Sequence, residues 1–210
     1  REERVPGAFF QYTGEFLDQR FIVMAGLRYD YHNIFGSIWT PRAHIMYKPD
    51  EFTSIKATFG RGLRTPNILA ENSYLLASAA NFYVNGELLG KNPALLDDLK
   101  MEDSWNFGAN VNRKFEVFGR TLNINLDYYH TKFNDQVVVD NETAYNKVNF
   151  YNLDGDSYSN CYQVEVKYEL IPRLEATLAY RYNDVKTTMG GRLLRAPLQS
   201  KYKGLLNLSY

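Results

Sequence analysis

Arg61 and Arg64 stand where a predicted strand meets a long loop, within the Gly- and Arg-rich run 59–66. A guanidinium presents a planar fork of donors, so it can bind a carboxylate or a catecholate through two hydrogen bonds. Both arginines are therefore candidates for holding an anionic ligand. A plain solvated charge at the rim of a sheet explains them equally well.

Further charged side chains fall on the polar faces of neighbouring predicted strands. Arg28 and Asp30 share one strand, and Arg42 lies on the next. They indicate either a patch for an anionic chelate or a cross-strand network of ion pairs. We favour the network, because opposite charges on adjacent strands are ordinary sheet stabilisers. Tyr129 and Arg181, on the polar faces of two later strands, complete the candidate ligand-binding residues of the sheet.

The loop at 63–100 carries aromatic side chains together with amides. Tyr74 and Tyr83 are its candidate binding residues, and Asn81 and Asn85 lie close to Tyr83 in sequence. Aromatic surfaces with a few polar groups suit the capture of a bulky chelate. The competing interpretation is a loop that folds on its own apolar residues. The loop contains no histidine, which disfavours haem capture through an axial histidine from this segment.

Other kinds of chemistry have little support in the sequence. His32, His44 and His130 are scattered without metal-ligand spacing, so we predict no metal site. The Asp-Gly-Asp run at 154–156 lacks the twelve-residue calcium pattern and is read as a turn. No catalytic constellation, phosphate loop or dinucleotide fingerprint is present, so we predict no enzyme and no cofactor. The chain has 24 basic and 24 acidic residues, and a net charge of zero does not favour nucleic acid.

Nine predicted β-strands position these residues. Side chains alternate between apolar and polar with a period of two, in strands at about 8–16, 21–31, 42–48 (beginning after Pro41), 55–60, 104–112, 122–129, 158–170, 174–183 and from 201 onward. Short connections fall at 17–20, 48–53, 113–120 and 170–173, and long ones at 32–40, 63–100, 140–156 and 185–200. An up-and-down meander places all short turns at one end, which is typical of outer-membrane barrels.

The two faces of the strands differ in a way that indicates lipid on one side and water on the other. The apolar faces end in aromatic residues, and the polar faces carry side chains such as Asn110, Asn125 and Asp127. Buried without partners, these polar groups would cost free energy, whereas a wet barrel interior solvates them. We therefore predict an all-β antiparallel meander that forms part of a transmembrane outer-membrane β-barrel. The competing fold is a soluble sandwich with Phe10 and Ile45 in a dry core.

A series of short motifs resembles TonB-dependent outer-membrane receptors, specifically the internal portion of the C-terminal barrel in Bacteroidetes-type proteins. The motifs are Gly26-Leu27-Arg28-Tyr29-Asp30, Pro41-Arg42, Tyr47-Lys48-Pro49, the run Phe59 to Pro66, Asn92-Pro93 with Leu95, Tyr151-Asn152-Leu153, Asp184-Val185-Lys186 and Pro197-Leu198 with Ser200-Lys201. The resemblance implies a large plugged barrel of 22 strands. We expect residues 1–210 to be a part of it, lacking the plug and the first and last strands, with 63–100 as a long extracellular loop.

The resemblance also implies a function and a location. It predicts TonB-dependent uptake of a scarce chelate, most often an iron–siderophore, in the Gram-negative outer membrane. Haem, cobalamin and glycans are other cargoes of such receptors, and a soluble β-sheet binding domain is the competing interpretation outside the class. The implied partners are the TonB–ExbB–ExbD complex, reached through the plug, the chelate itself and outer-membrane lipid.

Overall fold

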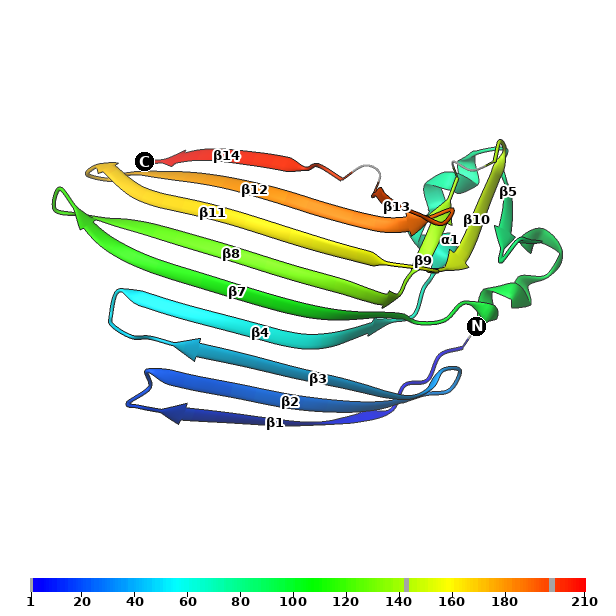
Figure 1. Cartoon of the computed structure of the whole chain (residues 1–210), viewed down its shortest axis with the longest axis horizontal. Helices are drawn as coiled ribbons and strands as arrows, with labels where there is room; N and C mark the ends of the chain where they lie inside the picture. Colours follow the sequence, from blue (N-terminus) through cyan, green and yellow to red (C-terminus); the bar gives the residue numbers. More distant parts are fainter. Residues whose placement is uncertain (1, 142–143, 197–198) are drawn as a thin grey trace.

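The protein is one large antiparallel sheet with a smaller unit at one end (Figure 1). The computed structural model describes residues 2–141, 144–196 and 199–210. The sheet is a meander in the order β1-β2-β3-β4-β7-β8-β11-β12, with β13 and β14 both pairing with β12. Its strands are β1 (Gly7–Phe16), β2 (Phe21–His32), β3 (Gly36–Tyr47), β4 (Thr53–Arg64), β7 (Glu102–Val117), β8 (Arg120–Asp135), β11 (Ser157–Ile171), β12 (Leu174–Met189), β13 (Arg192–Arg195) and β14 (Tyr202–Ser209).

Short turns join the strands at one end, as the connection lengths predicted. The β7–β8 turn is only Phe118 and Gly119, both with positive φ (50° and 71°), the backbone of a tight hairpin. In the β3–β4 turn the backbone N–H of Phe52 donates to Asp50 Oδ1 at 2.8 Å. This hydrogen bond lowers the pKa of the Asp50 carboxyl below its usual value. All nine predicted strands are present, most of them longer than the sequence pattern indicated.

The predicted long loop at 32–40 is wrong. β2 runs to His32 and β3 begins at Gly36 with a φ of 78°, so the connection is a tight turn. Pro41 therefore lies inside β3 and does not precede it. Because proline has no N–H, it cannot extend the ladder toward β4. The β3–β4 pairing accordingly ends at Arg42 opposite Gly60, while the β2–β3 pairing continues to the end of the hairpin.

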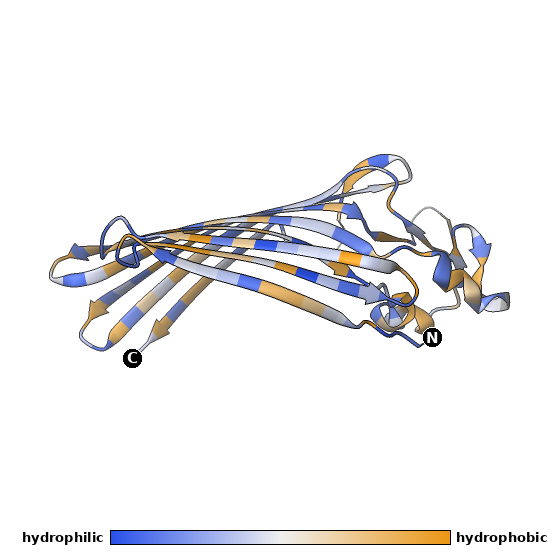
Figure 2. Cartoon of the chain, turned by 90° about the horizontal axis from the view of Figure 1, so that it is seen from below, coloured by the Kyte–Doolittle hydropathy of each residue, from blue (hydrophilic) through white to orange (hydrophobic). Residues whose placement is uncertain are grey.

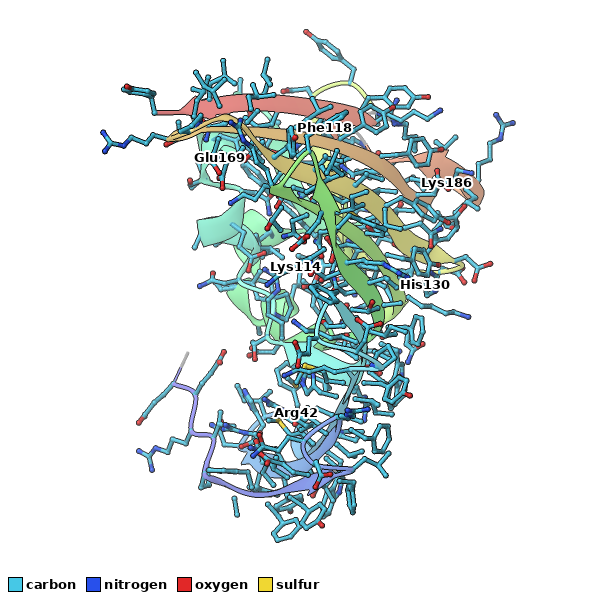
Figure 3. All side chains as sticks on the ribbon, turned by 90° about the vertical axis from the view of Figure 1, so that its left-hand side faces the viewer. Arg42, Lys114, Phe118, His130, Glu169 and Lys186 are labelled. Carbon is cyan, nitrogen blue, oxygen red and sulfur yellow. The ribbon has the colours of Figure 1, made fainter. Side chains whose placement is uncertain are left out.

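The two faces of the sheet are separated as the alternation predicted. Hydrophilic and hydrophobic residues alternate along the strands in Figure 2. In Figure 3 the sheet curves, with Arg42, Lys114 and Glu169 toward its concave side and His130 and Lys186 on its convex side. Within the described part of the large sheet, the apolar side chains form no dry core: Phe10 and Ile45 are 71% and 41% exposed. The soluble-sandwich interpretation is therefore wrong, because its central prediction was the burial of these side chains.

Aromatic rings mark two levels of the convex face. Tyr128, Tyr162, Tyr182 and Tyr202 are direct cross-strand neighbours, with successive ring centroids 4.9, 6.0 and 5.5 Å apart. Toward the short-turn end, Tyr168 follows Tyr162 by six residues, about 20 Å along a strand, and Phe21 is opposite Tyr47 with ring centroids 6.4 Å apart. The residues between are aliphatic: Val164, Val166, Leu126, Ile124 and Leu178. An apolar band between two aromatic girdles is the lipid-facing pattern of a transmembrane barrel.

The loops at the other end fold into a separate small unit, which we call the cap (residues 65–101, 136–141 and 144–156). It contains a second sheet in the order β6-β5-β10-β9. Its elements are α1 (Ile68–Glu71), η1 (Ser73–Ala77), β5 (Asn81–Val84), β6 (Glu87–Leu88), η2 (Leu89–Lys91), η3 (Pro93–Asp98), β9 (Val137–Asp140) and β10 (Lys147–Asn152). β5 and β10 pair in parallel, although about 65 residues separate them. Within the predicted long connection at 140–156, residues 147–152 therefore form a strand, β10.

A hydrophobic core holds the cap together. Its buried members come from both loops: Ile68, Leu75, Val84, Leu89, Leu95, Leu99, Val137, Val148 and Phe150. The loop at 63–100 thus folds on its own apolar residues with help from the second loop. Burial raises the pKa of the Tyr151 hydroxyl above its usual value. Within the described residues, no helix has the length and apolar character needed to cross a membrane.

Candidate functional site

A polar hollow of about 400 Å³ lies on the concave face over β4, β7 and β8. Its lining includes Lys56, Asn110, Asn125, Asp127 and Tyr129. These residues come from three adjacent strands because alternate positions share a face: Lys56 is opposite Asn110, which is opposite Asp127. A hollow with one cation, one carboxylate and several amides can present both donors and acceptors to a polar solute.

Hydrogen bonds between side chains fix the shape of this hollow. Asn110 Nδ2 donates to Asn125 Oδ1 at 2.8 Å and to Asp127 Oδ1 at 2.7 Å. Asn125 Nδ2 donates to the other oxygen of Asp127 at 2.7 Å. Three polar groups are thereby locked to one another, so the wall is rigid although it faces water.

Tyr129 owes its position to a glycine. A Cβ placed on Gly108 would lie 2.9 Å from the Tyr129 ring and 2.5 Å from Thr58 Oγ1. The absence of a side chain at Gly108 thus lets the ring lie across the neighbouring strand. Tyr129 remains 48% exposed. Of the predicted binding residues it is the one that lines this hollow, and its phenol ring offers a stacking surface to a ligand.

Arg28 and Arg42 both lie on the concave face, as predicted, but in different settings. Arg28 Nε donates to Asp30 Oδ2 at 2.7 Å, an ion pair within β2 rather than the cross-strand network that we favoured from the sequence. Arg42 lies between Gly26 and Gly60 on the flanking strands. A Cβ on Gly26 would come within 3.1 Å of Arg42 Cγ, so the arginine stem occupies the space that this glycine leaves. Arg28 and Arg42 share the lining of a smaller hollow of about 210 Å³.

The two arginines of β4 point to opposite faces and are both paired. Arg64 lies at the rim below the cap, where its Nε donates to Glu102 Oε2 at 2.7 Å and its Nη2 is 3.1 Å from Glu71 Oε2. Arg61 lies on the convex face and binds Asp103 through two hydrogen bonds of 2.9 and 3.0 Å. The rim interpretation fits Arg64, whereas Arg61 is turned away from the hollow.

Arg61 also spans the opening that Pro41 leaves between β3 and β4. Its Nη1 donates to the Trp39 carbonyl oxygen at 3.2 Å, beyond the last β3–β4 ladder pair. Its guanidinium lies 5.9 Å from the centre of the Trp105 ring. These contacts give Arg61 a structural role, because it joins three strands where the backbone ladder is incomplete.

The remaining predicted residues lie apart from the hollow. Tyr74 projects from η1 of the cap and is 63% exposed. Tyr83 lies in β5, where the Lys147 ammonium is 5.3 Å from the centre of its ring. Arg181 is on the concave face of β12, and its Nε donates to Gln163 Oε1 at 2.8 Å. The eight candidates therefore do not form one cluster: four lie on the concave face, one at its rim, two in the cap and one on the convex face.

A third hollow lies where the cap meets the sheet. It measures about 480 Å³ and its lining includes Thr65, Asn67, Ile68 and Leu99. Beside it His32 is 2% exposed, with its Nε2 3.4 Å from Thr65 Oγ1 and its Nδ1 accepting from the backbone N–H of Ile34. This arrangement is structural. Across the described ranges, no cluster of three or more potential metal ligands occurs.

Sequence reasoning missed the acidic partners and most of the hollow. Glu102 and Asp103 are consecutive, so they alternate to the two faces and meet Arg64 and Arg61 respectively. The signal was present, since two acids open the strand that follows the arginines. Asp127 was placed on a polar face, yet its proximity to Lys56 depends on the register of three strands.

The whole chain, residues 1–210, matches the family model described as TonB dependent receptor-like, beta-barrel. The protein belongs to this family. It is an outer-membrane protein of the β-barrel class, and its family consists of TonB-dependent transport receptors. The narrower Bacteroidetes-type assignment stays a prediction.

Individual relatives are distant and much longer. The chain is 25% identical over 143 residues to the probable TonB-dependent siderophore receptor PirA of Acinetobacter baumannii, covering 65% of this chain and 18% of that protein. The crystal structure of PirA from Acinetobacter baumannii aligns with a TM-score of 0.67 at 17% identity, over 95% of this chain and 30% of that one. The ferric enterobactin receptor PfeA of Pseudomonas aeruginosa aligns at 0.62 and 18% identity, over 86% and 26%. The chain thus spans less than a third of each relative, and the structural likeness establishes the fold alone.

Proposed function

We propose that this chain is part of a receptor that takes up an iron–siderophore across the outer membrane with energy from TonB. The observation that carries the proposal is the match of all 210 residues to the receptor barrel family. The printed names of the relatives, which include a probable siderophore receptor and a ferric enterobactin receptor, point to the same cargo class. The concave polar face is the wall along which such a cargo would pass.

The proposal includes an orientation and partners. The cap end faces the outside and the short turns face the periplasm, following the asymmetry of outer-membrane barrels. The complete receptor couples to the TonB–ExbB–ExbD complex through its plug, and lipid covers the convex face. The binding residues are Tyr129 and Arg42 on the wall, Arg28, Arg64 and Arg181 around them, and Tyr74 and Tyr83 in the cap. Arg61 is not among them, because it lies on the convex face and is engaged by Asp103.

Ferric siderophores are bulky and frequently anionic, and the wall offers what they require. Arginine forks suit carboxylate and catecholate oxygens, and the exposed ring of Tyr129 offers an apolar surface. Because Arg42 has no carboxylate partner among the described residues, it is the concave-face arginine most available to a ligand. Arg28 is less available, since Asp30 already occupies its Nε.

The test is ligand binding to the full-length receptor. Purified receptor is titrated with a ferric catecholate, a ferric hydroxamate, haem and cobalamin, with intrinsic fluorescence as the readout. Binding of a ferric siderophore and not of haem or cobalamin is expected. Tyr129→Ala with Arg42→Ala should weaken that binding about 10- to 100-fold, the range for well-placed aromatic and arginine contacts.

A matched control is Arg173→Gln in the β11–β12 turn, which removes one charge at the opposite end of the sheet. It should bind as the parent does. Deleting residues 67–91 would be a poor test, since that segment supplies Ile68, Leu75, Val84 and Leu89 to the core of the cap. Haem or cobalamin binding with no siderophore binding would disprove the proposed cargo.

A further inference from the structure

One cross-strand row on the convex face is unusually basic. Trp105 is opposite Lys132, Lys132 is opposite Tyr158, Tyr158 is opposite Lys186, and Lys186 is opposite Arg195. Directly opposite residues point to the same face of a sheet. Three cations and two aromatic rings therefore lie side by side across five strands, and we call this set the basic row. Lys186, labelled in Figure 3, shows the convex side to which the row points.

Tyrosine rings hold the cations of this region over the barrel surface. The Lys186 ammonium lies 5.8 Å from the centre of the Tyr158 ring. Lys201, just before β14, lies 5.5 and 5.3 Å from the rings of Tyr182 and Tyr202. Such cation–π contacts leave the outward side of each ammonium free to bind an anion.

Negative charge near the row does not neutralise it. Asp184 lies 3.8 Å from the Lys186 ammonium, and the exposed Asp156 immediately precedes the first residue of β11. In the described part of the chain, Lys132 and Arg195 contact no carboxylate. Arg195 donates one hydrogen bond from Nη2 to the Gln199 carbonyl oxygen at 2.7 Å, and Lys132 is exposed. The region thus keeps an excess of positive charge.

The distance of the basic row from the aromatic level that contains Tyr162 indicates the environment of the row. Tyr158 precedes Tyr162 by four residues, about 13 Å along the strand, or about 9 Å along the membrane normal for a strand tilted by 45°. Aromatic girdles mark the boundary between acyl chains and headgroups. The basic row therefore lies on the lipid-facing side at the level of the headgroups, at the cap end.

We propose that the basic row is a binding site for the phosphate groups of phosphorylated glycolipids in the outer leaflet. Arg195 offers a planar fork to a phosphate, and Lys132 and Lys186 offer point charges beside it. The aromatic rings between them lie against the sugar and the upper acyl chains. The site rests on the orientation proposed above and is independent of the cargo, because it faces away from the concave hollow.

The experiment uses the full-length receptor in neutral detergent with diphosphoryl lipid A as the probe. Native mass spectrometry counts bound lipid as the probe is titrated, and the dephosphorylated lipid with the same acyl chains is the comparison. The variant combines Lys132→Gln, Lys186→Gln and Arg195→Gln. Its affinity for the diphosphoryl lipid should fall about 100-fold, since each of the three cations near an anionic lipid contributes roughly fivefold.

The control variant removes three cations from the short-turn end: Lys114→Gln, Lys167→Gln and Arg173→Gln. It should retain the preference for the diphosphoryl lipid. Equal binding of the two lipids by the parent receptor, or an equal loss in both variants, would overturn the proposal. So would displacement of the lipid by millimolar inorganic phosphate, because the site would then bind free phosphate.

Siderophore titrations of the same preparations separate this proposal from the proposed function. The basic-row variant should keep its siderophore affinity and its heat-modifiable migration on gels, which reports an intact barrel. If the basic-row variant loses the preference for the diphosphoryl lipid but still binds the siderophore, the proposed lipid site is supported. If the parent receptor binds the diphosphoryl lipid selectively but binds no siderophore, the proposed lipid site is supported and the proposed cargo is disproved.

Discussion

The sheet and the cap stabilise themselves by different means. The sheet has long strands and ladder hydrogen bonds, yet its apolar side chains remain outward: Leu126 is 45% and Leu178 is 57% exposed. The cap has short elements, but Val84 and Phe150 are completely buried within it. The sheet therefore depends on surroundings outside these strands, for which we propose lipid on the convex side and water or the plug on the concave side, whereas the cap carries its own core. The same chain thus combines a sheet whose apolar side chains face outward with a cap whose apolar side chains are buried.

The junction between the two regions is polar. Arg64 bridges Glu102 of the sheet and Glu71 of the cap. Asn152 of the cap donates from Nδ2 to Asp135 of the sheet at 2.8 Å. Such contacts orient the cap on the sheet without extending its hydrophobic core into the sheet, so the cap is expected to unfold without unfolding the strands beneath it.

The largest expected effect comes from emptying the core of the cap. Phe150→Ala should destabilise the cap by about 3–5 kcal/mol, because a large buried side chain leaves a cavity. Hydrogen exchange on the full-length receptor should show lost protection in β5 and β10, with the amides of β7 and β8 unchanged. Tyr145→Ala removes a fully exposed ring and serves as the control. Equal loss of protection in the sheet would show that the two regions fold as one.

An intermediate effect is expected at the convex-face ion pair. Asp103→Asn keeps the side-chain shape but removes the charge that holds Arg61, whose side chain is 29% exposed. Hydrogen bonds to charged groups contribute about 1.5–3 kcal/mol, so the cost should be about 1–2 kcal/mol after allowing for partial exposure. The readout is the urea concentration at the midpoint of unfolding, measured on the receptor folded in lipid vesicles.

The exposed pair between Lys167 and Glu175 provides the comparison for this change. Its side chains are 43% and 52% exposed, so Glu175→Gln should change the midpoint very little. If both substitutions have the same effect, the three-strand role of Arg61 is disproved.

The smallest effect is expected in the β7–β8 turn. Phe118 is 95% exposed and has a φ of 50°, a conformation that a bulky residue adopts with difficulty. Phe118→Asn should stabilise the sheet by up to about 1 kcal/mol, because asparagine tolerates this conformation. The companion change Gly119→Ala should destabilise it by a similar amount, since the φ there is 71°. Opposite shifts of the unfolding midpoint in the same assay are expected for the two variants, and a loss of stability in Phe118→Asn would contradict the argument.

The period-two pattern by itself determined the strands, their meander and the two faces. Alternation is a local property, so Leu126 and Asp127 fall on opposite sides whatever the rest of the chain does. The same pattern also places Arg61 with Phe59 on the apolar face. The prediction treated Arg61 and Arg64 together as rim residues and overlooked this difference.

Only the tertiary structure decided the cap, the position of Pro41 and the basic row. The core of the cap joins Val84 to Phe150, and no periodicity predicts a contact between two loops so far apart in sequence. Pro41 indicated a strand start, but pairing of β3 with β2 carries the strand past it. Lys132 and Lys186 become neighbours of Tyr158 only through the register of three strands. Register is set by every cross-strand pair together, and therefore it cannot be read from any single strand.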